Sequence, residues 1–211
     1  MAPVPPPDAK APALDFRRIY HLAEVYTSVR FDSPDQIRAR WGPYYERLEV
    51  VELRSTRNLY LLGTLPGGRQ QEIVIRGTVN LKNSLYDARI RRRWNRELGI
   101  YLHSGFEAMA LALHRDILPR LDRGCELILM GHSLGAAEAL ILGLLLDHEG
   151  FRVGLVQASG QPRVTDAAGA RKYGSFPVLR VISPEYQGRA QVAVGVLRFC
   201  FRGGADKPEG G

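Results

Sequence analysis

The chain has 211 residues, of which 45% are hydrophobic and 24% are charged, and its formal net charge is +7. This length fits one domain with a sizeable core, and the composition excludes a largely disordered or membrane-embedded chain. The longest apolar run, residues 139–146, falls far short of the roughly 20 residues that a membrane-spanning helix needs.

Both ends of the chain lack apolar residues to bury. We therefore expect disordered segments at residues 1–14 and 203–211, on either side of a single domain at 15–202. The first segment is rich in proline and alanine and has no basic start or apolar stretch of a secretory signal, so we expect a cytoplasmic protein by default. Cys125 and Cys200 are predicted to be reduced thiols rather than a disulfide.

The first half of the domain begins with helical spacing of apolar residues and then changes to strand-like runs. Residues 16–30 predict a helix, and 34–47 predict one or two short helices. The runs 48–54 and 58–65, separated by Ser55 and Thr56, predict the two strands of a β-hairpin. A Pro-Gly-Gly turn at 66–68 ends the second run, and 71–77 predicts a third strand.

The second half alternates helices and strands. Ser104 is the expected N-cap of an amphipathic helix that ends near Pro119. A buried strand (125–130), an apolar helix (134–149) and another strand (151–159) follow, and two further strands are expected at 176–183 and 191–201. Strands that are apolar throughout, alternating with helices, indicate an α/β fold with a mostly parallel central sheet and helices on both faces.

The sequence between the buried strand and the apolar helix is G-x-S-x-G, formed by Gly131, His132, Ser133, Leu134 and Gly135. A strand, a sharp turn and a helix around this motif expose a serine nucleophile, and the two glycines avoid collisions with the neighbouring strand and helix. His132 is expected to turn toward the core. The alternative interpretation is a simple turn in which Ser133 caps the helix.

A nucleophilic serine also needs N–H donors for the oxyanion of the tetrahedral intermediate. Leu134 offers one such donor, because it lies at a helix N-terminus directly after the serine. The second is expected from residues 76–78, where the third strand ends.

Four segments carry a resemblance to a known family: "IVIRGT" (73–78), "HSGF" (103–106), "GHSLG" (131–135) and "ASGQPRV" (158–164). In this order and spacing they resemble the class 3 lipases, the fungal-type triacylglycerol lipases of the α/β-hydrolase fold. The resemblance covers about half of the chain, from near Glu72 to near Ile182.

The resemblance implies a serine hydrolase that acts on carboxylic esters of lipids. Ser133 would attack the ester, Thr78 and Leu134 would hold the oxyanion, and residues 79–95 would form a lid over the site. Neither a metal nor an organic cofactor is implied.

The base of the catalytic triad is not identified in this sequence. In α/β hydrolases the chain order is Ser, then Asp or Glu, then His. Only His148 follows Ser133, and it lies at the far end of the same predicted helix, roughly 22 Å away. His103, in the "HSGF" segment, is not the base in the family, and His21 and His114 are expected to be surface or packing residues.

The acid is equally open. The family's aspartate position is occupied by Tyr186, and Glu185 precedes it. Glu185 is either the acid of the triad, with the loop shifted by one residue, or a turn residue in solvent. Three explanations cover the missing histidine: a truncated or altered C-terminal end, a base from another residue or chain, or a loss of hydrolysis.

Loss of hydrolysis would leave a lipase-like domain that binds lipid or an anionic membrane surface. Its contact surface would be an arginine cluster, which is otherwise a solvated helix face. The cluster consists of Arg89, Arg91, Arg92, Arg93 and Arg96. No nucleic-acid partner is expected, because no zinc-finger, RNP-type or helix-turn-helix pattern accompanies the cluster.

Overall fold

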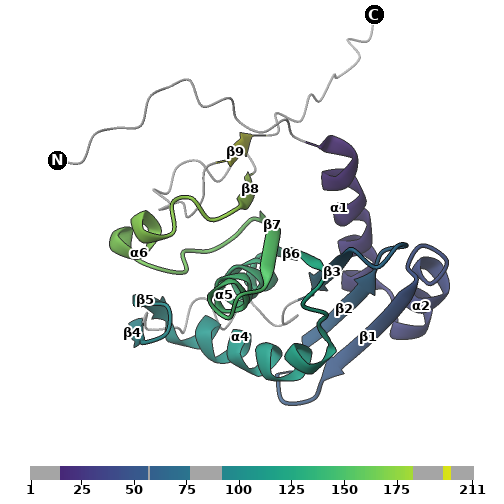
Figure 1. The fold of residues 1–211 in the computed structure, drawn as a ribbon, viewed down its shortest axis with the longest axis horizontal. Helices are drawn as coiled ribbons and strands as arrows, with labels where there is room; N and C mark the ends of the chain where they lie inside the picture. Colours follow the sequence, from purple (N-terminus) through teal and green to yellow (C-terminus); the bar gives the residue numbers. More distant parts are fainter. Residues whose placement is uncertain (1–14, 57, 77–91, 183–196, 201–211) are drawn as a thin grey trace, which may run out of the picture.

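The structure, a computed structural model, describes residues 15–56, 58–76, 92–182 and 197–200, the last four as backbone only. These residues form a seven-stranded sheet of order β1-β2-β3-β6-β7-β8-β9 and a separate ribbon of β4 and β5. Figure 1 shows helices on both faces of the sheet, so the α/β class is confirmed. The expected disordered ends, 1–14 and 203–211, lie outside the described residues.

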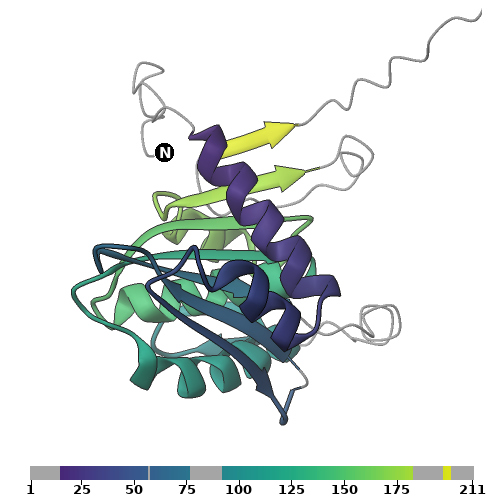
Figure 2. The same cartoon turned by 90° about the vertical axis from the view of Figure 1, so that its right-hand side faces the viewer.

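Two helices cover one face of the sheet. Helix α1 (Phe16–Phe31) begins where the Asp15 carboxylate accepts hydrogen bonds from two backbone N–H groups of the first turn. Helix α2 (Pro34–Trp41) begins with a capping box formed by Ser33 and Gln36. Figure 2 shows α1 lying across the sheet, where its buried residues join a core with Ile37, Ile128 and Met130.

The sheet is antiparallel at one edge and parallel elsewhere. Strands β1 (Arg47–Leu53) and β2 (Asn58–Thr64) form the expected hairpin, and β3 (Gln70–Ile75) pairs with β2 in antiparallel fashion. The parallel strands are then β6 (Glu126–His132), β7 (Arg152–Ser159), β8 (Val178–Ile182) and β9 (Leu197–Cys200). Strands β6, β7, β8 and β9 each lie within a predicted run or extend beyond it by at most two residues.

The larger core lies on the opposite face, under α4 (Ser104–Ile117) and α5 (Leu134–His148). The expected N-cap of α4 is wrong by one residue: His103 is the N-cap and makes no side-chain cap bond, so Ser104 lies inside the first turn. A short 3-10 helix, η1 (Leu118–Arg120), contains Pro119 and ends α4 as predicted.

Three elements, two strands and one helix, were missed. Strands β4 (Arg92–Asn95) and β5 (Ile100–His103) form an antiparallel ribbon, and α6 (Ala167–Lys172) follows β7. The ribbon includes the last four residues of the expected lid, whereas residues 79–91 lie outside the described residues. Strands of four residues are too short to give a periodic signal, and contacts outside the ribbon hold them: Asn95 donates to Glu107, and Leu102 bridges to Thr165.

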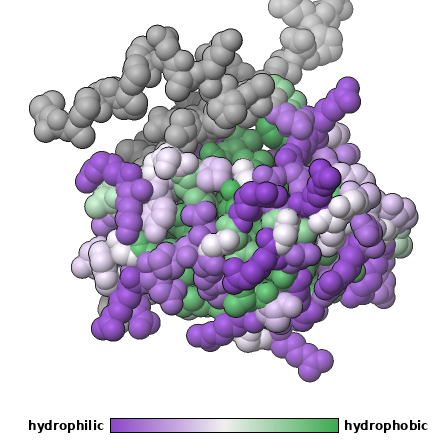
Figure 3. Space-filling model, in the orientation of Figure 1, coloured by the Kyte–Doolittle hydropathy of each residue, from purple (hydrophilic) through white to green (hydrophobic). Residues whose placement is uncertain are grey.

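Polar side chains cover much of the face seen in Figure 3, with apolar residues between them. Within the described ranges, no helix is long and apolar enough to cross a membrane. Cys125 is a free, buried thiol, as predicted, and its Sγ lies 3.0 Å from the carbonyl oxygen of Gly68. The side chain of Cys200 is outside the described atoms.

Candidate active site

Ser133 occupies a strained turn between β6 and α5. Its φ of 54° and ψ of −118° make it the only non-glycine residue with positive φ in the described part of the chain. Such backbone conformations cost about 1 to 3 kcal/mol and persist only where the surroundings enforce them. Here the Ser133 N–H donates to the Ser159 carbonyl at 2.9 Å, and its own carbonyl accepts from Ala136 N–H at 3.1 Å.

Gly131 makes this turn possible. A Cβ atom at this position would lie 2.2 Å from the carbonyl oxygen of Gly135 and 2.6 Å from the backbone nitrogen of Ala136. Both are backbone atoms of the first turn of α5, so no side-chain movement relieves the collision. The backbone therefore makes the sharp strand-to-helix turn that the G-x-S-x-G motif predicts. We call this turn the elbow.

The carboxyl ends of the parallel strands gather at the edge of the sheet where Ser133 lies. Ile75 of β3 is level with Gly131 of β6, and Gly131 is level with Ala158 of β7. Arg76, which follows β3, is therefore beside the elbow. In open α/β sheets, ligand sites form outside the carboxyl ends of the strands.

One of the two expected oxyanion donors, Leu134, lies within the described residues. Leu134 is the first residue of α5, and the helix has no side-chain cap, so its N–H points out of the helix N-terminus with no hydrogen-bond partner among the described residues. The other, Thr78, lies outside the described residues, as does Glu185. The last described residue before Thr78 is Arg76, whose N–H donates to the Leu59 carbonyl at 2.9 Å.

The prediction that His132 turns into the core is wrong. Its side chain is exposed, because an elbow residue between a strand end and a left-handed turn points out of the sheet edge. The imidazole ring lies 5.7 Å from the ring of Tyr26 in α1. Desolvation by the surrounding protein, followed by the nearby Arg30 guanidinium, lowers the pKa of His132.

The contacts of His103 within the described residues are with Val164 and Phe106 and give no sign of a catalytic role. Its backbone N–H donates to the Val164 carbonyl at 3.0 Å, and its ring stacks on Phe106 at 4.1 Å. Burial lowers the pKa of His103, and its Nδ1 has no hydrogen-bond partner.

The remaining histidines are far from the elbow or engaged elsewhere. His21 contacts the Glu72 carboxylate at 3.2 Å, and His114 contacts Glu149 at 2.9 Å. His148 is exposed at the C-terminal end of α5. All five histidines belong to the described residues, and none of them has a hydrogen bond to Ser133.

Sequence reasoning missed a polar pair behind the elbow. Glu138 of α5 is 0% exposed and accepts a hydrogen bond from Asn58 of β2 at 2.6 Å. The available signal was a single acidic residue within the apolar run "LGAAEALILGLLL". Its partner, 80 positions away, carried no signal at all.

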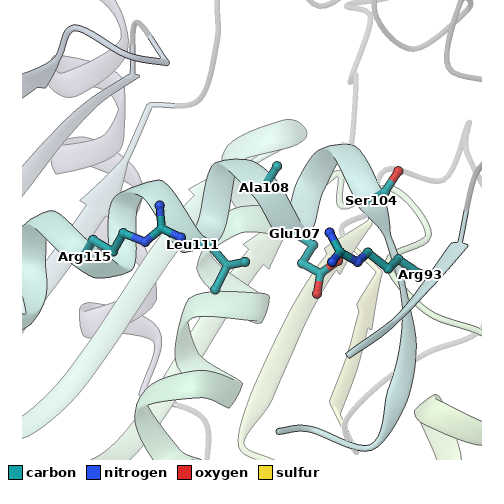
Figure 4. Close-up of a pocket in the computed structure, with 6 residues that line it drawn as sticks. All are labelled: Arg93, Ser104, Glu107, Ala108, Leu111 and Arg115. Atoms are coloured by element: carbon teal, nitrogen blue, oxygen red, sulfur yellow. The ribbon is translucent and has the colours of Figure 1, made fainter. Parts of the chain in front are cut away.

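A pocket lies between the β4–β5 ribbon and α4, and Ser133 does not line it (Figure 4). A second pocket, which shares Arg93, Glu107 and Arg115 with the first, has a volume of about 630 Å³ and is also lined by Trp94 and Arg96. Across the described part of the chain, no group of three or more His, Cys, Asp or Glu residues is arranged to hold a metal ion.

Comparisons with known proteins agree with this geometry. The Lipase (class 3) family matches residues 72–185, which is more than half of the chain. No curated protein matches the sequence. Three similar solved structures are fungal lipases.

Lipase II from Rhizopus niveus is 18% identical with a TM-score of 0.61, and the match covers 79% of this chain and 71% of that one. The lipase from Rhizopus microsporus var. chinensis is 20% identical with a TM-score of 0.63, covering 86% and 72%. Lip2 lipase from Yarrowia lipolytica is 19% identical with a TM-score of 0.61, covering 86% and 80%. The chain belongs to the class 3 lipase family and has the α/β fold of the fungal lipases.

Proposed function

We propose that this protein hydrolyses carboxylic esters of lipids with Ser133 as the nucleophile. The observation that carries the proposal is the positive φ of Ser133 between β6 and α5, since a binding domain has no use for a turn of this cost. Membership of the class 3 lipases supports the substrate class. One lipase of this fold, 19% identical with a TM-score of 0.62, is described as a triacylglycerol lipase with a serine protease triad at its catalytic centre.

The reaction would proceed in two acyl transfers. Ser133 Oγ attacks the ester carbonyl, the Leu134 N–H and the proposed donor Thr78 stabilise the oxyanion, and the alcohol leaves. Water then releases the fatty acid from the acyl-enzyme. Glu185 is the proposed acid of the triad. The proton acceptor is not assigned, and an elbow with an oxyanion hole but no base retains only weak catalysis.

The test is hydrolysis of short- and long-chain p-nitrophenyl esters, with Ser133→Ala as the critical variant. Ser175→Ala is a matched control, because Ser175 is exposed before the start of β8, at the opposite edge of the sheet from Ser133. Ser133→Ala should lose all ester hydrolysis above background, while Ser175→Ala should retain it.

A fluorophosphonate that labels activated serines gives a second readout, since it needs no turnover. We expect the mass increase on the peptide that contains Ser133. Equal rates for the native chain and Ser133→Ala, together with no labelling, would rule the proposal out.

A second function, binding to an anionic membrane surface, is favoured by the β4–β5 ribbon. Trp94 and Tyr101 are paired across the ribbon with ring centroids 5.1 Å apart, and they are 50% and 45% exposed. Trp and Tyr prefer the membrane interface, and arginines are attracted to anionic lipids. Arg92, Arg93 and Arg96 flank this pair and are exposed, whereas Arg89 and Arg91 lie outside the described residues.

Sedimentation with vesicles that contain anionic lipid tests this second function. The variant has Arg92, Arg93 and Arg96 replaced by Glu. The control has the same replacements at the exposed residues Arg54, Arg69 and Arg152, which gives an equal change in net charge away from the ribbon. We expect the ribbon variant to bind the vesicles more weakly than the control variant. Equal binding of the two variants would show that the ribbon is not the membrane-binding surface.

A further inference from the structure

A carboxyl group is sealed into the core next to the nucleophile elbow. Glu138 is 0% exposed and is the only charged residue among the buried residues of α5. It lies four residues after Leu134, one turn or about 6 Å along the helix axis. Buried carboxyl groups are retained at a cost unless they have hydrogen-bond partners.

Its partner links the helix to the sheet edge at which Ser133 lies. Asn58, also 0% exposed, is the first residue of β2, and its Nδ2 donates to Glu138 Oε2 at 2.6 Å. The next residue, Leu59, accepts the N–H of Arg76, which directly follows β3. The hydrogen bond therefore joins the first turns of α5 to the end of the β2–β3 pair.

We infer that Glu138 and Asn58 form a positioning pair that holds the first turns of α5, and with them Ser133 and the Leu134 N–H, against the end of β2. The inference rests on the proposed hydrolysis at Ser133. Glu138 touches no reacting atom in this role. It acts through the placement of the elbow and through its own charge.

The pair works in this way only while the carboxyl group is neutral. Burial raises the pKa of Glu138 to about 8, and the hydrogen bond from Asn58 opposes part of this rise. Ionisation would place a negative charge one helical turn from the Leu134 N–H. A charge of this sign opposes the oxyanion that the N–H stabilises, so hydrolysis should decline as the pH rises above the pKa.

Among the described residues, no charged side chain contacts Glu138. Within the same residues its Oε1 has no hydrogen-bond partner, and Oε2 accepts from Asn58 Nδ2. Several elements around α5 carry titratable or charged groups. On the sheet these are Tyr60 of β2, Glu72 of β3, Arg76 directly after β3, Glu126 and His132 of β6, and Arg152 of β7. On α4 they are Glu107, His114, Arg115 and Asp116. None of them forms a hydrogen bond or ion pair with Glu138 within the described chain.

The experiment measures kcat for p-nitrophenyl butyrate from pH 6 to 9.5, after subtraction of the Ser133→Ala rate. The native chain should lose about tenfold in kcat between pH 7 and pH 9. Glu138→Gln has the same shape and no charge, and its kcat should lack this alkaline loss. Tyr60→Phe is the control, since it removes a hydrogen bond to Asp116 from the same strand and should retain the native profile.

A second variant changes the hydrogen-bond partner of Glu138, and unfolding measurements are made on each variant. Asn58→Leu removes the hydrogen bond that favours the ionised form, so the alkaline decline should move to higher pH. Thermal unfolding at each pH establishes that each variant is folded where its rate is measured. If Asn58→Leu does not fold, Glu138→Gln decides alone.

Failure of the positioning pair and failure of the proposed function give different results. A native profile in Glu138→Gln, with Ser133-dependent hydrolysis present, would overturn the positioning pair and leave the proposed function standing. No Ser133-dependent hydrolysis in the native chain at any pH would overturn the proposed function, and the positioning pair with it.

Discussion

At the scale of single residues, the elbow depends on the missing side chain of Gly131. Gly131→Ala places a Cβ atom 2.2 Å from the Gly135 carbonyl oxygen, so α5 has to move away from β6. We expect a loss of at least about 2 kcal/mol in the free energy of unfolding, together with the loss of any Ser133-dependent hydrolysis. Urea unfolding and ester hydrolysis measure the two effects.

Another motif glycine provides the control. A Cβ atom on Gly105, in the first turn of α4, would meet only the ring of His103 at 3.4 Å, an ordinary contact. Gly105→Ala should therefore retain or slightly increase stability, because alanine favours the helix. Equal losses at both positions would contradict the steric argument for Gly131.

At the scale of elements, α1 and the turn after α2 are fastened to β3 through one buried carboxylate. Glu72 is 1% exposed, accepts from Tyr45 Oη at 2.6 Å and contacts His21 of α1 at 3.2 Å. Burial, followed by the neighbouring Glu72 charge, raises the pKa of Tyr45, so its hydroxyl stays a donor at any working pH. The Glu72 carboxylate therefore joins both α1 and the turn after α2 to the same face of the sheet.

Tyr45→Phe removes that donor and leaves the carboxylate with fewer partners. The expected loss is about 1.5 to 3 kcal/mol in the free energy of unfolding, the usual range for hydrogen bonds to charged groups. The neighbouring Tyr44→Phe should change it by less than about 0.5 kcal/mol, because Tyr44 is 42% exposed and its hydroxyl has no hydrogen-bond partner in the described chain. Similar losses in the two variants, measured by urea unfolding, would refute the role of Glu72.

At the scale of the whole molecule, Glu138 couples global stability to pH. Its pKa is raised from 4.5 to about 8 by burial. The unfolded chain therefore releases this proton near pH 4.5, whereas the folded chain keeps it up to about pH 8. The contribution is fully present below pH 4.5 and is lost as the pH rises through this window, at about 1.4 kcal/mol per pH unit.

Glu138→Gln should remove this slope. Between pH 5.5 and 7.5, the native chain should lose on the order of 2 kcal/mol in the free energy of unfolding relative to the variant. Glu97→Gln, at an exposed position, serves as the control. Parallel pH profiles for the native chain and Glu138→Gln would show that the carboxyl group is ionised in the folded state.

Local sequence patterns predicted most of the described elements. Residues 16–30 and 134–149 have helical spacing or continuous apolar character, and the helices α1 and α5 end within one residue of these ranges. The β4–β5 ribbon was not predicted, because strands of four residues are too short to show a periodic pattern and the ribbon is held by contacts with Glu107 and Thr165. Ser133 was predicted as an elbow residue from its motif, and its positive φ agrees.

The sequence by itself determined most of the elements, the family and the position of the elbow, since periodicity, turn residues and a short motif act over a few neighbouring residues. Only the tertiary structure decided which distant side chains meet. It placed Asn58 against Glu138, gathered His21 and Tyr45 at Glu72, and exposed His132 beside Tyr26. These contacts join residues tens of positions apart, and their energies depend on burial, which no local pattern encodes.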